Sequence, residues 1–296
     1  MRIALTGSSG LIGHAIAAEL QRAGHTLVRI GRAAASDVAF DLEQPRVLER
    51  AELSGCDALV HAAGVIDEDF RGTGRERANA KALAGPQAML DAAAGAQVRR
   101  FVYVSSAHVY GALEGRIDES HPLAPISEYA RSHVATEELF ARAAAPQSAA
   151  LLLARPCAVY GRPPDLARFT RWSLIPFDFP RQALGGTITL KSPGLQQRNF
   201  VAADSVAAGV AAWLDRPTPG ITAANMPGAE TLSVYDFALR CARLAEGETG
   251  VRCEVVRPPL QGAAPAPLSY LTLGTAPPPS ESLDNHLRAM VRALSR

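Results

Sequence analysis

The chain has 296 residues, which is enough for one large α/β unit or for a main domain carrying a smaller lobe. Its 30 Lys and Arg side chains nearly balance its 29 Asp and Glu side chains, so no global field attracts nucleic acid or an anionic membrane. Scattered cysteines, a short N-terminal apolar run and the lack of any span-length apolar stretch predict a soluble cytoplasmic protein with neither a disulfide framework nor a metal site.

Short β-rich runs alternate with helical stretches through the first half of the chain. The runs cover residues 2–6, 26–30, 57–61, 101–105 and 150–154. Such alternation predicts an α/β fold with a doubly wound parallel sheet of the Rossmann type. We expect residues 1–160 to form a dinucleotide-binding domain and residues 161–296 mainly a smaller C-terminal substrate-binding lobe, with residues 197–228 returning to the main sheet.

The second half is less regular. Residues 161–195 are punctuated by Pro and Gly and are expected to form a wall over a binding crevice, and residues 204–214 predict a helix. The Pro-rich stretch 257–279 is expected to run extended over the surface. Apolar residues from Leu283 to Leu294 follow one helical stripe, which predicts a closing amphipathic helix capped near Ser280 or Ser282.

Glycines 7, 10 and 13 in "ALTGSSGLIGHAIAAEL" follow the first strand and open the first helix. Without side chains, Gly7 and Gly10 let the backbone turn tightly beside a pyrophosphate at the helix N-terminus, and Gly13 permits close packing. The alternative is an ordinary tight turn, but the strand-turn-helix context favours a dinucleotide.

The end of the second strand bears on which dinucleotide is bound. NAD sites usually carry an acidic residue there, whereas this chain has Gly31 and then Arg32. Arg32 would pair with a 2′-phosphate, with Arg29 as a helper, which favours NADP and makes NAD the less favoured cofactor; a plain surface arginine is the alternative. Asp41 and Leu42 could meet the adenine, and "HAAG" at residues 61–64 could pass close to the cofactor.

A wider set of motifs resembles one family. The glycine motif, "HAAG", Asn79, "VYVSSAHVYG" (102–111), Tyr129 and "LARPCAVYG" (153–161) resemble the extended short-chain dehydrogenase/reductases of the nucleotide-sugar epimerase/dehydratase type. The resemblance implies that Ser106 and Tyr129 handle the proton of a carbonyl beside the nicotinamide, that Asn79 kinks a helix and holds a water, and that the helices containing Asn79 and Tyr129 form a homodimer. The predicted cofactor-binding set is Gly7, Ser9, Gly10, Leu11, Ile12, Gly13, Arg32, Asp41, Leu42, His61, Ala62, Ala63, Tyr129, His133 and Pro156.

His133 occupies the position of the family's lysine. A lysine ammonium favours the phenolate of the tyrosine, whereas a histidine is mostly neutral at pH 7 and is shorter. Three outcomes stay open: His133 acts as an imidazolium, the site is slow, or the protein binds nucleotide without catalysis. A Tyr/His pair at helical spacing with no chemical role is the structural alternative.

Two further positions bear on the reaction and on the substrate. Family dehydratases carry Asp-Glu directly after the serine, where this chain has Ala107 and His108, which argues against dehydration. His108 could exchange a proton beside a ketone or simply line the pocket. Arg198 resembles the family's diphosphate clamp. Nucleotide-sugar binders of the family, however, often have an Asn after the Arg-Pro turn, where this chain has Ala158, so one contact to the diphosphate would be missing.

The sequence therefore predicts an NADP-dependent reductase or epimerase acting on a nucleotide-linked keto sugar or a similar carbonyl compound. The alternative is a catalytically impaired NADP-binding module with a sensing or structural role.

Overall fold

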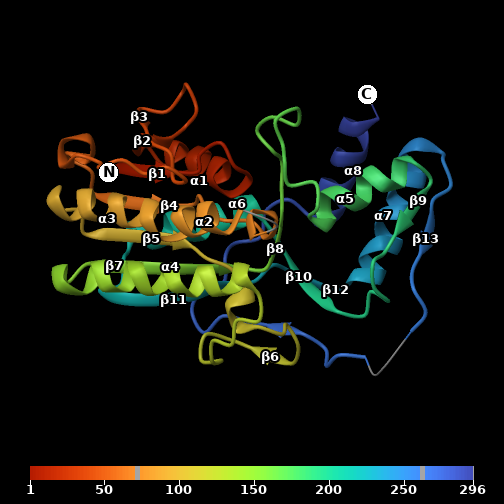
Figure 1. The fold of residues 1–296 in the computed structure, drawn as a ribbon. Coiled ribbons are helices and arrows are strands. Elements are labelled where there is room, and N and C mark those ends of the chain that lie inside the picture. Colours follow the sequence, from red (N-terminus) through yellow and green to blue (C-terminus); the bar gives the residue numbers. More distant parts are fainter. Residues whose placement is uncertain (71–73, 261–263, 296) are drawn as a thin grey trace.

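The computed structural model describes residues 1–70, 74–260 and 264–295. Its main body is a seven-stranded parallel sheet in the order β11-β7-β5-β4-β1-β2-β3 (Figure 1). The strands are β1 (Arg2–Thr6), β2 (Thr26–Gly31), β3 (Val38–Ala39), β4 (Ala58–His61), β5 (Arg100–Val104), β7 (Ala150–Pro156) and β11 (Gly220–Met226). The predicted Rossmann-type α/β fold is confirmed.

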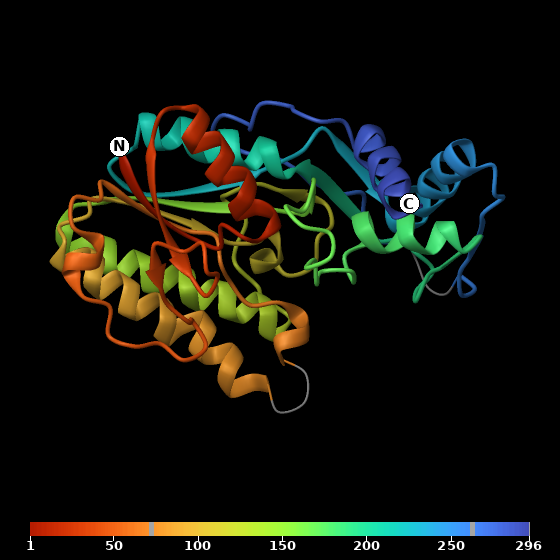
Figure 2. The same cartoon turned by 90° about the horizontal axis from the view of Figure 1, so that it is seen from above.

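Helices cover both faces of this sheet (Figure 2). On one face, α1 (Leu11–Arg22) and α6 (Ala203–Asp215) pack against each other and share a core with β1, β4, β5 and β7. On the other, α3 (Gly85–Gly95) and α4 (Glu128–Ala144) enclose a second core. Because both faces are covered, β4 and β7 are buried along their whole length, as their unbroken apolar runs predict.

The helical segment before α3 changes its hydrogen-bond pattern at Asn79. Helix α2 (Arg75–Asn79) ends there and a π-helical segment, η4 (Ala80–Ala84), leads into α3. The Thr136 hydroxyl lies 2.8 Å from the Ala82 carbonyl oxygen, so a side chain of α4 reaches the π turn. A π turn of this kind often lies at a functional site and redirects the helix axis. The predicted irregularity at Asn79 is therefore present.

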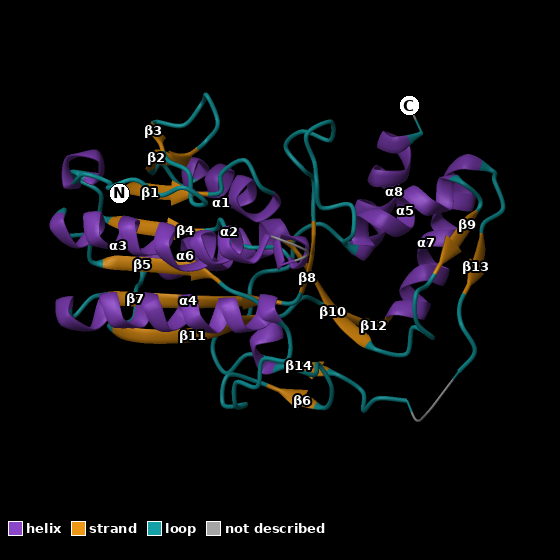
Figure 3. Ribbon diagram, viewed as in Figure 1, coloured by secondary structure: helices purple, strands orange, loops and turns teal. Residues whose placement is uncertain are grey.

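A smaller lobe stands beside the carboxyl ends of the strands (Figure 3). It contains helices α5 (Ile175–Leu184), α7 (Val234–Thr249) and α8 (Leu283–Leu294) around one apolar cluster. Its strands are β8 (Ala158–Tyr160), β10 (Gln197–Ala202) and β12 (Glu230–Ser233) in one sheet, and β9 (Thr187–Thr189) with β13 (Glu254–Val256) in another. Ser282 caps α8 by accepting from the Asn285 N–H, as predicted.

Residues 197–228 divide between the two bodies. Strand β10 pairs with β8 and β12 beside the lobe, whereas α6 packs on α1 and β11 forms an edge of the main sheet. The loop 227–229 then leads back to β12 and the lobe.

The expectation for residues 257–279 is wrong in one part. Residues 261–263 lie outside the described chain, but Ser269–Tyr270 forms β14 and pairs with β6 (Arg116–Ile117), and the Tyr270 side chain is buried. The Tyr270 hydroxyl donates to the Arg155 carbonyl oxygen at 2.6 Å and also lies 3.0 Å from Asn225 Oδ1. A strand of two residues is too short to show an alternation of apolar and polar side chains, so it could not be recognised within the Pro-rich segment.

Within the described residues, no helix is long and apolar enough to cross a membrane, and no three His, Cys, Asp or Glu side chains gather as a metal site.

Candidate active site

In the glycine loop between β1 and α1, backbone segments approach each other too closely for side chains at two positions. Gly7 has φ of +75°, and a Cβ there would lie 2.6 Å from the Ala63 nitrogen; a Cβ at Gly13 would lie 2.1 Å from the Gly7 carbonyl oxygen. Both positions therefore require glycine. Gly10 precedes α1, and no side chain of the described residues caps that end, which leaves the positive end of the helix dipole open to an anion.

A cavity of about 660 Å³ runs from this loop, along the carboxyl ends of the strands, to the lobe. Its size falls within the range of small-molecule sites. The predicted residues that line it are Gly7, Ser9, Gly10, Leu11, Ile12, Arg32, Asp41, Leu42, Ala62, Ala63, Ser106, His108, Tyr129, Pro156 and Arg198. Gly13, His61 and His133 are not among the lining residues.

His61 supports the cavity from behind its wall. Its side chain is buried, Nδ1 lies 2.7 Å from the Thr6 hydroxyl, and the ring stacks on those of Tyr103 and Phe140. Burial lowers the pKa of His61 to about 3, so the ring is neutral. The His61 side chain faces the core, while the neighbouring Ala62 and Ala63 line the cavity. Passage of residues 61–64 close to a cofactor stays a prediction.

His133 is also buried, with 4% of its surface exposed. Its Nδ1 lies 2.6 Å from the Tyr103 hydroxyl, and its ring meets that of Tyr129 edge-on with 4.5 Å between the ring centres. Burial lowers the pKa of His133 to about 3, and the charge of Arg171 acts in the same direction. This lowered pKa argues against the imidazolium alternative, because the ring would be neutral at pH 7. His133 does not line the cavity, and its contact with a cofactor stays a prediction.

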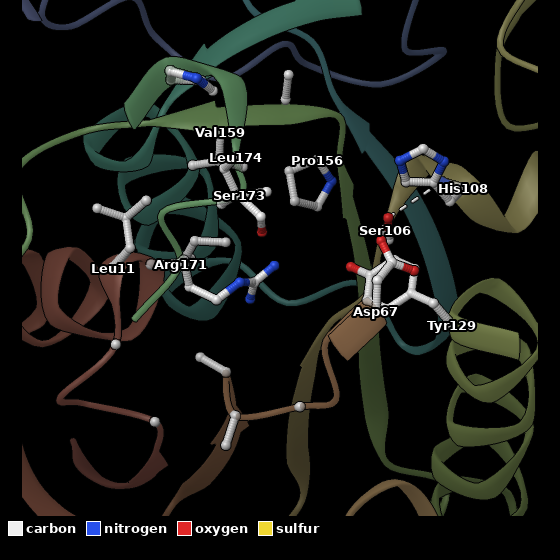
Figure 4. A pocket seen from close by; sticks show the side chains of 18 of the residues that line it. Leu11, Asp67, Ser106, His108, Tyr129, Pro156, Val159, Arg171, Ser173 and Leu174 are labelled. Carbon is white, nitrogen blue, oxygen red and sulfur yellow. Dashed lines mark hydrogen bonds between the residues drawn. The ribbon is translucent and has the colours of Figure 1, made fainter. Parts of the chain in front are cut away.

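Ser106, His108 and Tyr129 meet at one end of the cavity (Figure 4). Ser106 precedes the 3₁₀ turn η5 (Ala107–Tyr110), and its Oγ accepts from the His108 N–H at 3.2 Å. Helix α4 begins after Ser127, whose hydroxyl accepts from the Ala130 N–H, and this start fixes Tyr129 in the first turn. The Ser106 hydroxyl, before η5, and the Tyr129 phenol, on α4, thus reach the same end of the cavity.

Burial and neighbouring charges shift the pKa values of these groups. Burial raises the pKa of the Tyr129 phenol, while a hydrogen bond with the Ser106 side chain and the charge of Arg171 oppose that rise. Burial lowers the pKa of His108 to about 4, and the Arg198 guanidinium adds to this effect. A neutral His108 beside the phenol, at 6.0 Å between ring centres, can accept a proton but carries no charge at pH 7.

Asp67 and Arg171 are among the lining residues that were not predicted from the sequence. Asp67 opens the 3₁₀ turn η2 (Asp67–Phe70), and Arg171 comes from the irregular stretch before α5. In Figure 4, the Arg171 guanidinium extends into the cavity toward the side that holds Asp67, Ser106 and Tyr129. Asp67 follows "HAAG" closely and could have been suspected, but Arg171 lies in a segment without periodicity.

The far end of the cavity is charged. Arg32 lines it with 67% of its side chain exposed, and its Nη1 lies 4.0 Å from Glu43 Oε1. Glu43 also accepts from Arg77 at 2.8 Å. At the lobe end, Arg198 Nη1 donates to the Gln197 carbonyl oxygen at 2.8 Å, which steadies the guanidinium beside the cavity.

The family model described as NAD dependent epimerase/dehydratase family matches residues 3–225. The chain belongs to the NAD dependent epimerase/dehydratase family. Among curated family relatives, the chain is 27% identical to the low-salt glycan biosynthesis protein Agl12 of Haloferax volcanii over 50% of this chain and 47% of the relative. It is 32% identical to a dTDP-glucose 4,6-dehydratase of an Actinoplanes species, over 36% and 35%. The matches thus span about half or less of these relatives' lengths.

Solved structures of the epimerase/dehydratase type share the fold over nearly the whole chain. UDP-glucuronic acid 4-epimerase from Bacillus cereus, in complex with UDP-glucuronic acid and NAD, has a TM-score of 0.79 at 19% identity and covers 100% of this chain and 99% of its own. UDP-N-acetylglucosamine 4-epimerase from Methanobrevibacter ruminantium has a TM-score of 0.78 at 16% identity, covering 98% and 97%. At these identities the likeness shows the fold alone.

Proposed function

We propose that the protein is an NADP-dependent reductase or epimerase that acts on a nucleotide-linked keto sugar or a similar carbonyl compound. The observation that carries the proposal is one continuous cavity with the glycine loop and the uncapped start of α1 at one part, and Ser106 with Tyr129 at another. The loop offers a tight backbone cradle, and the phenol and hydroxyl supply the donors that a carbonyl oxygen needs.

In this proposal a nicotinamide dinucleotide, when bound, supplies or accepts the hydride. The Ser106 hydroxyl hydrogen-bonds the substrate oxygen, and Tyr129 gives that oxygen a proton during reduction or removes one during oxidation. Arg198 lies at the lobe end of the cavity, where its guanidinium would bind a diphosphate. No carboxylate directly follows Ser106, so we favour reduction or epimerisation over the dehydration that the name of the Actinoplanes relative describes.

The activity is tested by following NADPH oxidation with a panel of nucleotide-linked keto sugars. Replacing Tyr129 by Phe should lower kcat/KM by about 10²-fold or more, since a general acid is lost. Tyr235→Phe is the matched control, because Tyr235 lies outside the cavity lining and its ring, which packs under Arg257, is kept. Equal rates for the wild type and Tyr129→Phe would contradict the assignment.

The cofactor preference rests on Arg32. Several of the structurally similar proteins carry NAD, according to their descriptions, whereas in this chain a guanidinium lines the far end of the cavity. We expect Arg32→Ala to weaken NADP binding about tenfold or more and to leave NAD binding nearly unchanged. Arg22→Ala, an exposed arginine paired with Glu19, is the control. Equal losses for both dinucleotides, or none, would remove the argument for NADP.

A catalytically impaired NADP-binding module is the second candidate, and the burial of His133, which lowers its pKa to about 3, favours it. His133→Lys would restore the family's amine. Higher NADPH turnover in this variant would support an impaired or adapted oxidoreductase. Tight NADPH binding by both forms, with no turnover of any keto sugar, would support the binding module.

The family resemblance also suggests a homodimer formed by the helices around Asn79 and Tyr129. Leu83, on the π turn beside them, keeps 38% of its surface exposed in the single chain, which is consistent with a partner there. Sedimentation velocity of the wild type and of Leu83→Glu tests this proposal: the charged variant should dissociate a dimer built on this face.

A further inference from the structure

Neither imidazole beside Tyr129 carries positive charge at neutral pH. His133 lies behind the phenol on α4 and His108 lies beside it on η5; burial lowers their pKa values to about 3 and about 4. A phenol that exchanges protons near pH 7 needs a nearby cation to stabilise its phenolate. The charge that a lysine would supply from position 133 must therefore come from another element.

The cavity side of the phenol holds such a cation. Arg171 lines the same cavity as Tyr129, and Figure 4 shows its guanidinium extended across the cavity toward the Asp67 and Tyr129 side. Its Nε is buried and has no hydrogen-bond partner among the described residues. Buried arginine nitrogens normally have hydrogen-bond partners. A guanidinium that points into the cavity without this bond is therefore consistent with a role in the cavity. The charge of Arg171 lowers the pKa of Tyr129, which is the direction expected of a facing cation.

Other charged groups near the phenol are opposed or engaged. Asp67 on η2 faces Tyr129 and raises its pKa. Lys81 on the π turn lies 2.8 Å from Asp69. Arg198 on β10 lines the cavity too, but its charge acts on His108 and it donates to the Gln197 carbonyl. Arg171 is therefore the cavity-lining cation whose charge lowers the pKa of Tyr129.

We propose that Arg171, rather than His133, supplies the positive charge that stabilises the Tyr129 phenolate during proton transfer. The cation would then come from the segment before α5, across the cavity, instead of from the next turn of α4. Arg171 acts through Tyr129 and is a positioning residue. The inference rests on the proposed function, because it concerns the proton step assigned to Tyr129. A guanidinium keeps its charge at every pH that the fold survives, so the stabilisation would not titrate away.

The direct test measures the phenol itself. A difluorinated tyrosine, which titrates in a milder pH range than tyrosine, is placed at position 129 of the full chain, and its ionisation is followed by ¹⁹F NMR without substrate. Arg171→Gln should raise the phenol pKa by about one unit, a tenfold loss of phenolate at a given pH. Arg171→Lys keeps a cation and should leave the phenol pKa close to its wild-type value. Asp67→Asn should lower the phenol pKa.

Arg168→Gln is the matched control, because Arg168 belongs to the same segment but has 89% of its side chain exposed. An unchanged phenol pKa in Arg171→Gln overturns the inference, as does a shift of equal size in Arg168→Gln. Should Arg171→Gln fold poorly, the Arg171→Lys and Asp67→Asn titrations still decide: a phenol pKa that rises in Arg171→Lys or stays constant in Asp67→Asn counts against it.

Kinetics separates this role from substrate anchoring. If Arg171 stabilises the phenolate, the limb of the kcat–pH profile that reports the ionisation of Tyr129 should move to higher pH in Arg171→Gln. A rise in KM with an unshifted profile would instead make Arg171 an anchor for an anionic group and would overturn the inference. Failure of the proposed function looks different: no variant oxidises NADPH with any keto sugar, while the ¹⁹F titration still responds to Arg171.

Discussion

The hydroxyl of Tyr103 lies 2.6 Å from Nδ1 of His133, and both side chains are buried. Tyr103 comes from the centre of the sheet and His133 from α4, so this contact joins the two elements directly behind Tyr129. The histidine is thereby fixed in a stack of rings that also includes His61 and Phe140. Residue 133 serves here as a support for the phenol.

We predict that Tyr103→Phe destabilises the fold by about 1–3 kcal/mol, because it leaves a buried imidazole nitrogen without its partner. Urea unfolding with an unchanged m value would measure the loss. Tyr160→Phe is a useful comparison, since that hydroxyl donates to the Glu281 carbonyl far from Tyr129. Both variants should lose stability, but only Tyr103→Phe should also lower NADPH turnover; identical turnover in the two would argue against the supporting role.

Stability should fall as the pH is lowered below 6.5. The pKa values of His61 and His133 are lowered to about 3, whereas in the unfolded chain they return to about 6.5. Between these limits the unfolded state binds more protons, so acid favours unfolding, by about 2 kcal/mol for each histidine at pH 5. Urea midpoints at pH 7 and pH 5 check this prediction. His133→Gln should flatten the dependence, with His14→Gln, at an exposed site, as the control variant.

Glu137→Ala should cost about 3–5 kcal/mol of folding stability. Glu137 receives two hydrogen bonds from Arg155, at 2.9 and 2.6 Å, and both side chains are almost fully buried. Removing the carboxylate leaves a buried, uncompensated guanidinium. Glu138→Ala is the control, because Glu138 is 65% exposed and lies 3.8 Å from Arg142; its loss should stay within about 1 kcal/mol. Similar losses in the two variants would contradict the prediction.

Gly13→Ala should destabilise the chain by about 2 kcal/mol or more, since the new Cβ would lie 2.1 Å from the Gly7 carbonyl oxygen and force the glycine loop apart. Apart from Gly64 itself and its two chain neighbours, no heavy atom of the described residues lies within 4 Å of the place a Cβ would take there, so Gly64→Ala should change stability by no more than about 0.5 kcal/mol. Thermal unfolding of both variants compares them. A stable Gly13→Ala protein would show that the loop has more room than the structure gives it.

The main sheet was predictable because its signals are local. Strands β4 and β7 are unbroken apolar runs, and Gly7 and Gly13 mark a turn that only glycine tolerates. Strand β14 was not predictable, since two residues carry no periodicity and their pairing with β6 depends on contacts distant in sequence. Packing decided that pairing.

The site was predictable where a motif fixes the backbone and not where charge depends on burial. Ser106 and Tyr129 follow a strand and begin a helix, so their positions could be inferred, and both line the cavity. The neutral state of His133 depends on the rings that enclose it, and the place of Arg171 depends on how a segment without regular structure folds over the sheet. Sequence spacing encodes neither.

The contact of the Tyr270 hydroxyl with residues of β7 and β11 has a consequence for biosynthesis. Strand β11 ends at Met226, but Asn225 Oδ1 and the Arg155 carbonyl meet the Tyr270 hydroxyl only after the entire lobe helix α7 has emerged from the ribosome. All seven strands can therefore pair while the Asn225 Nδ2 group still lacks its acceptor, the Leu271 carbonyl oxygen. We expect a nascent chain halted before Ser269 to stay sensitive to protease, and to gain resistance once Tyr270 is added.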